Sequence, residues 1–439
     1  MSKNPEVLIQ AVARLWARPR PGPDNLLADT DFLAIQKSCE EIYPNAGKGM
    51  TLSIALCNAV RSLGLPCLIA PERPELGVSA ENASSKLIEA LERTNVRRMH
   101  LCPLDLADTL PSMSFGRCRI HRFTSSELAE LFRSTVLERC FPNAKLDTER
   151  FSRFSWLVID ETSQVDGEPG KRALPFFYEK INSDAGRIEP HTNKLPSAVE
   201  LALFFVLLAP WEEWVEMPTI DWRPFQIPWT HTSSDDIFEQ PAVPRSADSL
   251  NWETKVWTTT SGEEVEFDVP VNLPLSKVAQ SVVNFLTPHA WDDLQKAIRS
   301  SLFETPIIHF AVRAFFATGI DEFLAFLTVA EAALGVESDY KKSKNSLHPK
   351  VRGTKRIAAR VSALLGSNAH GETYSDLFNL RSAFIHGREM QPISTIDRIR
   401  ARSLARRIAI ALVRVALSQH PPLSREEFAN DLLDRGLQM

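Results

Sequence analysis

The chain lacks the sequence patterns of several protein classes. Its histidines show no zinc-like spacing and no two cysteines form a CxxC pair; the six are Cys39, Cys57, Cys67, Cys102, Cys118 and Cys140. The first ten residues, MSKNPEVLIQ, lack the apolar core of a signal peptide. The longest apolar run, around 201–210, is shorter than a membrane span. We therefore expect a soluble cytoplasmic protein with reduced thiols, no metal and no membrane association.

Length and hydrophobic content predict a globular chain of several domains. With 439 residues, of which 44% are hydrophobic, the chain is long enough for two or three domains with buried cores. The spacing of apolar residues predicts a mainly helical region 1–97, a mixed region 98–272 with a connection rich in Trp and Pro, and a helical domain 273–439 with its core at 302–417. The predicted fold class is α+β, with mixed N-terminal and middle regions followed by an all-α helical bundle.

Local patterns predict the first elements. Helical spacing predicts helices at 51–63, 84–91, 125–137 and 197–208. Ser125 is expected to cap the third of these. Extended segments are expected at 67–70, 99–104, 117–121 and 154–159. A hairpin is expected over 254–269, with Ser261 and Gly262 in its turn.

Two segments are similar to the nucleotide-binding motifs of motor proteins. Residues 44–51, PNAGKGMT, are similar to a phosphate-binding loop, and residues 156–161, WLVIDE, are similar to the strand and acids that hold magnesium. The loop has Pro44 in place of the opening glycine and Met50 in place of the phosphate-binding lysine. We therefore interpret these segments as a helix start and a buried strand that ends in acids.

Positive charge is concentrated near the end of the chain. Residues 341–414 hold 16 Lys and Arg against 4 acids, a net charge of +12, whereas the whole chain carries −5. The remainder therefore carries about −17. A difference of this size indicates a polyanion partner, such as RNA, for the basic part.

Four amphipathic helices are predicted within this part of the chain. The first is 321–334, the second is 354–365, and the third begins at Thr373 or Ser375 and ends at Gly387. The last begins after Ser394, with Asp397 in a capping box. Arg356 and Arg360 are expected on the surface of the second helix. On the last helix, two rows of arginines are expected along the two flanks of its core face: Arg398, Arg402 and Arg406, and Arg400, Arg407 and Arg414.

Glu331 shares the apolar face of the first of these helices. It follows Leu327 by four residues and Leu324 by seven, so the three side chains lie on one side. An unpaired buried carboxylate is costly, so an arginine from a neighbouring helix is one expected partner. The alternative is that Glu331 lies at the edge of the apolar stripe and is solvated.

Arg381 and His386 stand in the segment LRSAFIHG, residues 380–387. A guanidinium can hold a phosphate, and an imidazole exchanges protons near neutral pH. Residues five apart are about 140° apart around a helix, so the two would act together across a symmetric dimer or after unwinding of the last turn. The alternative is structural: Arg381 binds Glu331 or Asp376, and His386 caps its helix.

The segment 302–417 resembles the HEPN superfamily, and most closely its Apea-like branch. The resemblance rests on the helix 323–334 with Glu331, the basic helix 354–365 and the tract 377–387. It implies a HEPN-like helical bundle that usually dimerises. In active members of this superfamily an arginine and a following histidine cleave RNA without a metal, and many members belong to toxin–antitoxin or antiphage systems.

Carried over to this chain, the resemblance makes Arg381 and His386 the catalytic pair. Ser382 is then the polar neighbour of the arginine, where many relatives have asparagine. The expected function is a metal-independent endoribonuclease of bacterial antiphage defence or a toxin system, with no cofactor. Its expected partners are RNA, a second copy of the chain, and an antitoxin or phage-derived trigger. The alternative is a non-catalytic HEPN module that dimerises and binds RNA or a protein. The residues expected to bind RNA are Arg356, Arg360, Arg388, Arg398, Arg402 and Arg406.

Overall fold

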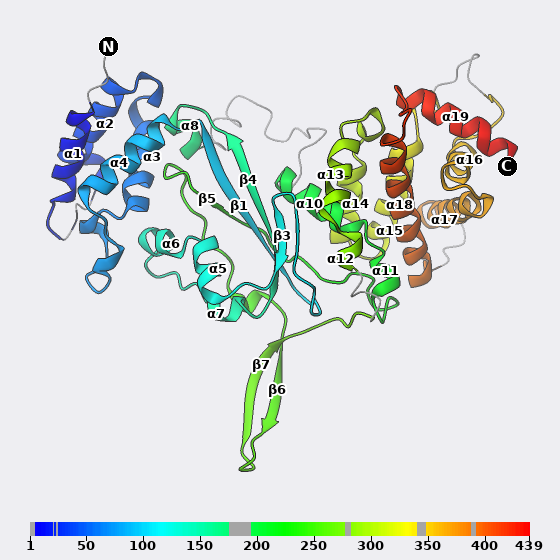
Figure 1. Cartoon of the computed structure of the whole chain (residues 1–439), viewed down its shortest axis with the longest axis horizontal. Helices are drawn as coiled ribbons and strands as arrows, with labels where there is room; N and C mark the ends of the chain where they lie inside the picture. Colours follow the sequence, from blue (N-terminus) through cyan, green and yellow to red (C-terminus); the bar gives the residue numbers. More distant parts are fainter. Residues whose placement is uncertain are drawn as a thin grey trace. The chain divides into compact units, whose positions relative to one another are not determined.

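The protein is α+β and divides into two compact units (Figure 1). The computed structural model describes residues 5–20, 22, 25–174, 195–276, 282–339, 348–387 and 392–439. The first unit comprises Met1–Pro103, Arg122–Ile188 and Ile227–Pro270, and the second comprises Leu104–His121, Glu189–Gln226 and Val271–Met439. The division into three consecutive domains stays a prediction, because compactness does not show which parts fold independently.

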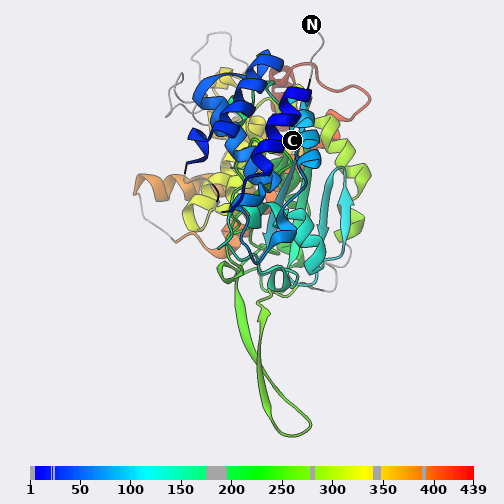
Figure 2. The same cartoon turned by 90° about the vertical axis from the view of Figure 1, so that its left-hand side faces the viewer.

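Four helices begin the first unit and pack on one another, as the blue ribbons of Figure 2 show: α1 (Glu6–Trp16), α2 (Thr30–Ile42), α3 (Gly49–Leu63) and α4 (Ala80–Glu92). Their apolar faces form a core that includes Leu15, Phe32 and Leu56. The helices predicted near 51–63 and 84–91 are confirmed as α3 and α4. Gly64 ends α3 with φ of 84°, a conformation that glycine adopts without strain.

The sheet of the first unit contains β4 (Ser155–Gln164), β1 (Asn95–Leu104) and β5 (His231–Ser234), in that spatial order. Strands β1 and β5 are antiparallel, and His100 lies opposite Thr232. The strands predicted at 99–104 and 154–159 are therefore confirmed. The strand predicted at 67–70 is wrong: Pro66–Leu68 form a 3₁₀ turn, for which a proline at the first position is well suited.

Three short helices contribute to an apolar cluster that also includes Leu101, Trp156 and Val158 of this sheet: α5 (Ser125–Leu131), α6 (Ser134–Cys140) and α7 (Thr148–Phe151). The single helix predicted over 125–137 is broken, because Arg133 adopts φ of 54° between α5 and α6. The capping residue is Thr124 rather than Ser125, and Thr124 forms a capping box with Glu127. The predicted helix start was thus one residue late.

The predicted hairpin is confirmed as β6 (Trp252–Thr258) and β7 (Glu264–Pro270), an antiparallel pair that projects as an arm in Figures 1 and 2. Gly262 occupies the turn with φ of 87°. Trp257 lies opposite Val265, and both side chains are exposed. In the second unit, β2 (Met113–Phe115) and β3 (Cys118–His121) form a shorter antiparallel pair in the region expected to be extended.

The second unit is mainly helical. Its first described helices are α10 (Ser197–Leu207), α11 (Trp211–Trp214), α12 (Val282–Phe285) and α13 (Pro288–Ala297). They are followed by α14 (Ile307–Phe316), α15 (Gly319–Leu334), α16 (Gly353–Leu365), α17 (Asn368–His386), α18 (Thr395–Ala416) and α19 (Arg425–Gln438). The helices predicted as 197–208, 321–334 and 354–365 are confirmed as α10, α15 and α16.

Two predictions about the last helices are corrected. Helix α17 begins at Asn368 rather than near Thr373, so Gly371 lies inside it. A Cβ on Gly371 would lie 2.5 Å from the Ala358 carbonyl oxygen, so the glycine permits close packing of α17 on α16. Helix α18, with the predicted capping box of Ser394, is not the last, because α19 follows it.

Candidate functional site

Arg381 forms an ion pair with Glu331 that joins α17 to α15. Its Nη1 donates a hydrogen bond of 2.5 Å to Glu331 Oε1, and the side chains of the two residues are 27% and 21% exposed. The guanidinium also lies 5.6 Å from the ring centroid of Phe378. An arginine from a neighbouring helix does therefore pair with Glu331, as one of the two sequence alternatives expected.

Burial and the ion pair act on Glu331 in opposite directions. Loss of hydration raises the pKa of the carboxyl, while the charge and the hydrogen bond of Arg381 lower it. Burial is the larger influence, so the pKa lies above its ordinary value. Burial of the Glu331 carboxyl thus opposes its ionisation more strongly than Arg381 favours it, so the ion pair forms at a cost in desolvation.

His386 is the last residue of α17 and is exposed. Gly387 follows with φ of 63° and ends the helix where the sequence predicted. Ser382, next to Arg381, is half-buried. Because α17 stays helical to His386, Arg381 and His386 point about 140° apart around its axis. Unwinding of the last turn is not observed, so one copy of α17 does not aim the two side chains at one point.

The predicted surface positions of Arg356 and Arg360 are wrong, because both side chains are buried. Arg360 Nη1 and Nη2 bind the two carboxylate oxygens of Asp339 at 2.5 and 2.9 Å. Its Nε and Nη1 donate to the carbonyls of Ala429 and Leu334, each at 2.9 Å. Arg360 thus ties α16 to α19 and to the end of α15. Arg356 donates to Asp339 and to two backbone carbonyls of the same loop region.

Arg402 and Arg406 are also buried instead of facing solvent. Arg402 Nη2 donates to the carbonyls of Leu207 and Ala209, which lie at the C-terminal end of α10, where a cation is favoured. Burial lowers its pKa to about 10. Arg406 Nε donates to Glu212 at 2.8 Å and its Nη2 to Glu213 at 2.8 Å. Neither arginine is available to a phosphate.

Glu322 on α15 is fully buried and pairs with Arg398 and Arg223, a contact that the sequence did not predict. Its carboxylate accepts hydrogen bonds from Trp222 Nε1 at 2.8 Å, Arg223 Nη2 at 3.1 Å and Arg398 Nη1 at 3.2 Å. Arg398, predicted to bind RNA, is thus engaged, with 24% of its side chain exposed. Helical spacing could have placed Glu322 on the apolar face, as it did Glu331, because the buried Phe326 follows Glu322 by four residues and shares its side of the helix.

The exposed basic surface is therefore smaller than the charge count suggested. Arg388, the remaining predicted RNA-binding residue, and Lys341, Lys342 and Lys344 lie outside the described residues. The exposed basic side chains of the described part of 341–414 are Lys350, Arg352, Lys355, Arg407 and Arg414, with Arg400 42% exposed in contact with Asp376 and Asp397.

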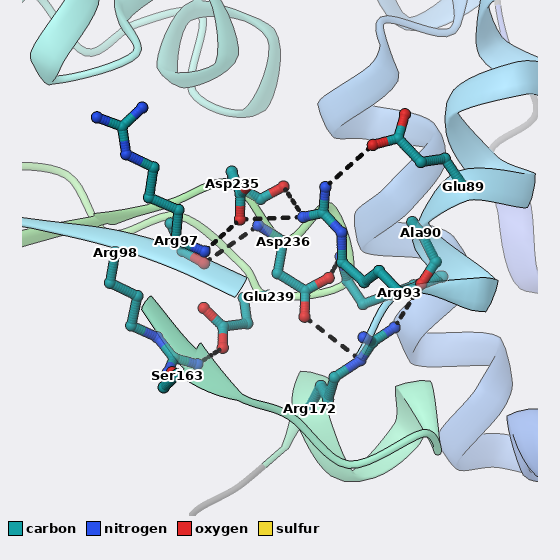
Figure 3. A network of polar contacts seen from close by, with 12 residues as sticks. Glu89, Ala90, Arg93, Arg97, Arg98, Ser163, Arg172, Asp235, Asp236 and Glu239 are labelled. Carbon is teal, nitrogen blue, oxygen red and sulfur yellow. Dashed lines mark hydrogen bonds and ion pairs between the residues drawn. The ribbon is translucent and has the colours of Figure 1, made fainter. Parts of the chain in front are cut away.

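A second charged cluster lies in the first unit, where Figure 3 shows it joining α4, β1, α8 (Pro169–Ala173) and the segment after β5. Arg93 Nη1 lies 3.0 Å from Asp235 Oδ1, and the Arg97 backbone N–H donates to the same oxygen at 2.9 Å. Arg172 Nε lies 3.3 Å from Asp236 Oδ2, and both side chains are buried. The arginines and acids of this cluster pair with one another within the protein. We therefore assign the cluster a structural role, which is to hold these elements together.

The acids of the motor-like segment are also engaged by the protein. Asp160 forms two hydrogen bonds with Arg97, at 2.9 and 2.7 Å. Glu161 Oε2 lies 3.0 Å from Nε2 of the buried His100. At the loop, the Glu40 carboxylate accepts the Gly49 N–H at 3.1 Å. A negative charge at this helix start opposes phosphate binding, which fits the interpretation of these segments as structural.

No known protein family, no curated protein and no solved structure matches the chain. Within the described ranges, no group of three or more His, Cys, Asp or Glu side chains could hold a metal ion. In the same part of the chain, no helix combines the length and the apolar character that crossing a bilayer requires. All six cysteines are described, and none of them forms a disulfide.

Proposed function

We propose that the chain is a metal-independent endoribonuclease of the HEPN type, acting in bacterial antiphage defence or a toxin system. The observation that supports the proposal is the arrangement on α17: Arg381 is held by Glu331, and His386 is exposed at the end of the same helix. Ser382 is the polar neighbour of the arginine. An antitoxin or a phage-derived trigger would control the activity.

The proposed reaction is attack of a ribose 2′-hydroxyl on the adjacent phosphate. One His386 imidazole removes the proton of the hydroxyl, the 2′-oxygen bonds to phosphorus, and the bond to the 5′-oxygen breaks. The second His386, in its imidazolium form, gives a proton to that leaving oxygen and becomes a neutral imidazole. A guanidinium has five N–H donors, so Arg381 can keep its bond to Glu331 and still donate to the phosphate.

Two copies of the chain would form the complete site. Because Arg381 and His386 diverge on one helix, a symmetric homodimer that apposes two copies of α17 supplies the second imidazole and the second guanidinium. Exposed Ile385 on the same helix end, with 51% of its surface accessible, fits a surface that a second copy covers.

We assign RNA binding to the exposed basic side chains, because the buried arginines cannot contact a phosphate. Lys350, Arg352, Lys355, Arg407 and Arg414 are exposed and can contact the phosphate backbone. Each phosphate neutralised releases counterions, so affinity falls steeply as salt rises.

The test is cleavage of labelled tRNA by the purified full chain in EDTA, which removes free divalent ions. Wild type is expected to cleave, and His386→Ala is expected to lose about 100-fold or more in rate, the range of general acid–base catalysis. His420→Ala, an exposed histidine of the same unit, is the matched control and should cleave as wild type does. Absence of cleavage of any RNA by wild type, or equal rates for His386→Ala and wild type, contradicts the proposal.

A second candidate is a non-catalytic HEPN module that dimerises and binds RNA or a protein. The ion pair of Arg381 with Glu331 favours it, since the arginine then has a structural role between α17 and α15. Expression in bacteria separates the two. Growth arrest that either Arg381→Ala or His386→Ala relieves supports the enzyme, whereas unchanged behaviour of both variants with retained RNA binding supports the module.

A further inference from the structure

A pocket in the second unit combines apolar walls with four ionisable side chains that the proposed nuclease does not use. Its volume is about 590 Å³, a size typical of small-molecule sites. The lining residues are Leu195, Glu200, His309, Val312, Arg313, Phe316, Ala317 and Asp321. They come from the segment before α10, from α10 itself, from α14 and the turn after it, and from the start of α15, helices that lie together in Figure 1.

The sequence of α14 explains why one helix supplies so much of the lining. His309, Val312, Arg313 and Phe316 follow one another at i, i+3, i+4 and i+7, so they share one face. Two cationic or titratable groups thus alternate with two apolar groups along a single stripe. Gly319, with φ of 59°, then turns the chain into α15.

Glu200 orients the imidazole of His309. Its carboxylate lies on α10 with 11% of the side chain exposed, and Oε1 is 3.2 Å from His309 Nδ1. A carboxylate can only accept a hydrogen bond, so Nδ1 carries the proton in this contact. Nε2 is therefore the nitrogen left to a ligand, and in the imidazolium it is a donor.

Arg313 and Asp321 are the exposed charges of the lining. Within the described ranges neither forms an ion pair with another residue. A guanidinium fork fits carboxylate and phosphate oxygens in two parallel hydrogen bonds. Asp321 can accept a hydrogen bond from a donor group of the ligand.

We propose that this pocket binds a small organic oxyanion with an apolar body. Arg313 holds the anionic group, Glu200 keeps the imidazole of His309 in place, and Val312 and Phe316 contact the apolar body. The shared chemistry is that of a carboxylate or a phosphate monoester. The site is independent of Arg381 and His386, so binding is a separate property from RNA cleavage.

The test is titration of the full chain, by calorimetry and ligand-observed NMR, with 3-phenylpropionate and with phenyl phosphate. At least one probe is expected to bind with a Kd below about 1 mM, and neutral benzyl alcohol is expected to bind at least about tenfold more weakly. The anion that binds more tightly shows whether the pocket prefers a ligand with a carboxylate or one with a phosphate.

Variants link any binding to the pocket. Arg313→Ala is expected to weaken binding by about tenfold or more, because it removes charge-assisted hydrogen bonds. Arg299→Ala removes an exposed arginine that follows α13 in the same unit, and this variant should bind the probe as wild type does. The proposal is overturned if neither anion binds with a Kd below about 1 mM, or if Arg313→Ala binds the anion as tightly as wild type does.

Discussion

Helices α17 and α18 both carry residues that the sequence analysis expected to act on RNA, yet these side chains occupy opposite environments. On α18, Arg402 and Arg406 point into the protein and bind helix carbonyls or glutamates. On α17, Arg381 is a quarter exposed and His386 lies in solvent. A count of positive charge along the chain treats these residues alike, whereas only exposed charges can contact a phosphate.

The difference depends on where the counter-charge comes from. Glu212 and Glu213, the partners of Arg406, precede it by almost two hundred positions in the chain. Such acids turn an arginine row into an internal ion-pair network, which is stable only when each charge has a partner. The comparison predicts that substitutions of the buried arginines on α18 affect folding and that substitutions at the end of α17 affect chemistry.

Arg402→Ala is expected to have the largest effect on stability. It removes a buried cation and leaves the α10 carbonyls and the Glu212 carboxylate without it, which typically costs about 3–5 kcal/mol in the free energy of unfolding. The measurement is denaturant unfolding followed by circular dichroism. Arg407→Ala, an exposed neighbour on α18, should change the value by less than about 0.5 kcal/mol. Equal losses for both variants would show that the contrast between buried and exposed arginines has no energetic basis.

Glu331→Gln is expected to have an intermediate effect that depends on pH. Gln keeps an acceptor for Arg381 but loses the charge, so the free energy of unfolding should change by about 1 kcal/mol at neutral pH. The folded-state pKa of Glu331 lies above 4.5, so between 4.5 and that pKa the folded protein binds more protons than the unfolded chain. The contribution of Glu331 to stability therefore falls as pH rises through this window.

The variant should lack this fall, and its stability relative to wild type should improve from pH 4.5 upward through the window. Unfolding curves recorded at several pH values measure the difference. Asp376→Asn, an exposed acid on α17, is the control and should show no comparable trend. A difference between wild type and Glu331→Gln that does not vary with pH would contradict the stated role of burial at Glu331.

His386→Ala is expected to have the smallest effect on folding. The imidazole is exposed at a helix end, so the free energy of unfolding should change by less than about 0.5 kcal/mol. The same denaturation experiment measures it beside Arg402→Ala. A loss above about 2 kcal/mol would mean that His386 has a structural role, and a loss of cleavage in this variant could then not be assigned to chemistry.

Local signals predicted many elements correctly. Gly64, Gly366 and Gly387 end their helices in the left-handed conformation, and the helix ranges predicted as 51–63 and 354–365 stop directly before the first two of these glycines. Where prediction failed, the local signal was ambiguous: Pro66 begins a turn rather than a strand, and Arg133 interrupts a helix through an unusual backbone conformation.

The sequence by itself determined the period of most helices, several of their C-terminal ends and the hairpin, because these depend on residues within a few positions of one another. Only the tertiary structure decided which arginines are buried. Asp339, Glu212 and Glu322 become their partners through packing of distant segments, and no local pattern records that pairing. Packing of α10 on α14 also places Glu200 beside His309 and forms a pocket that neither segment predicts by itself.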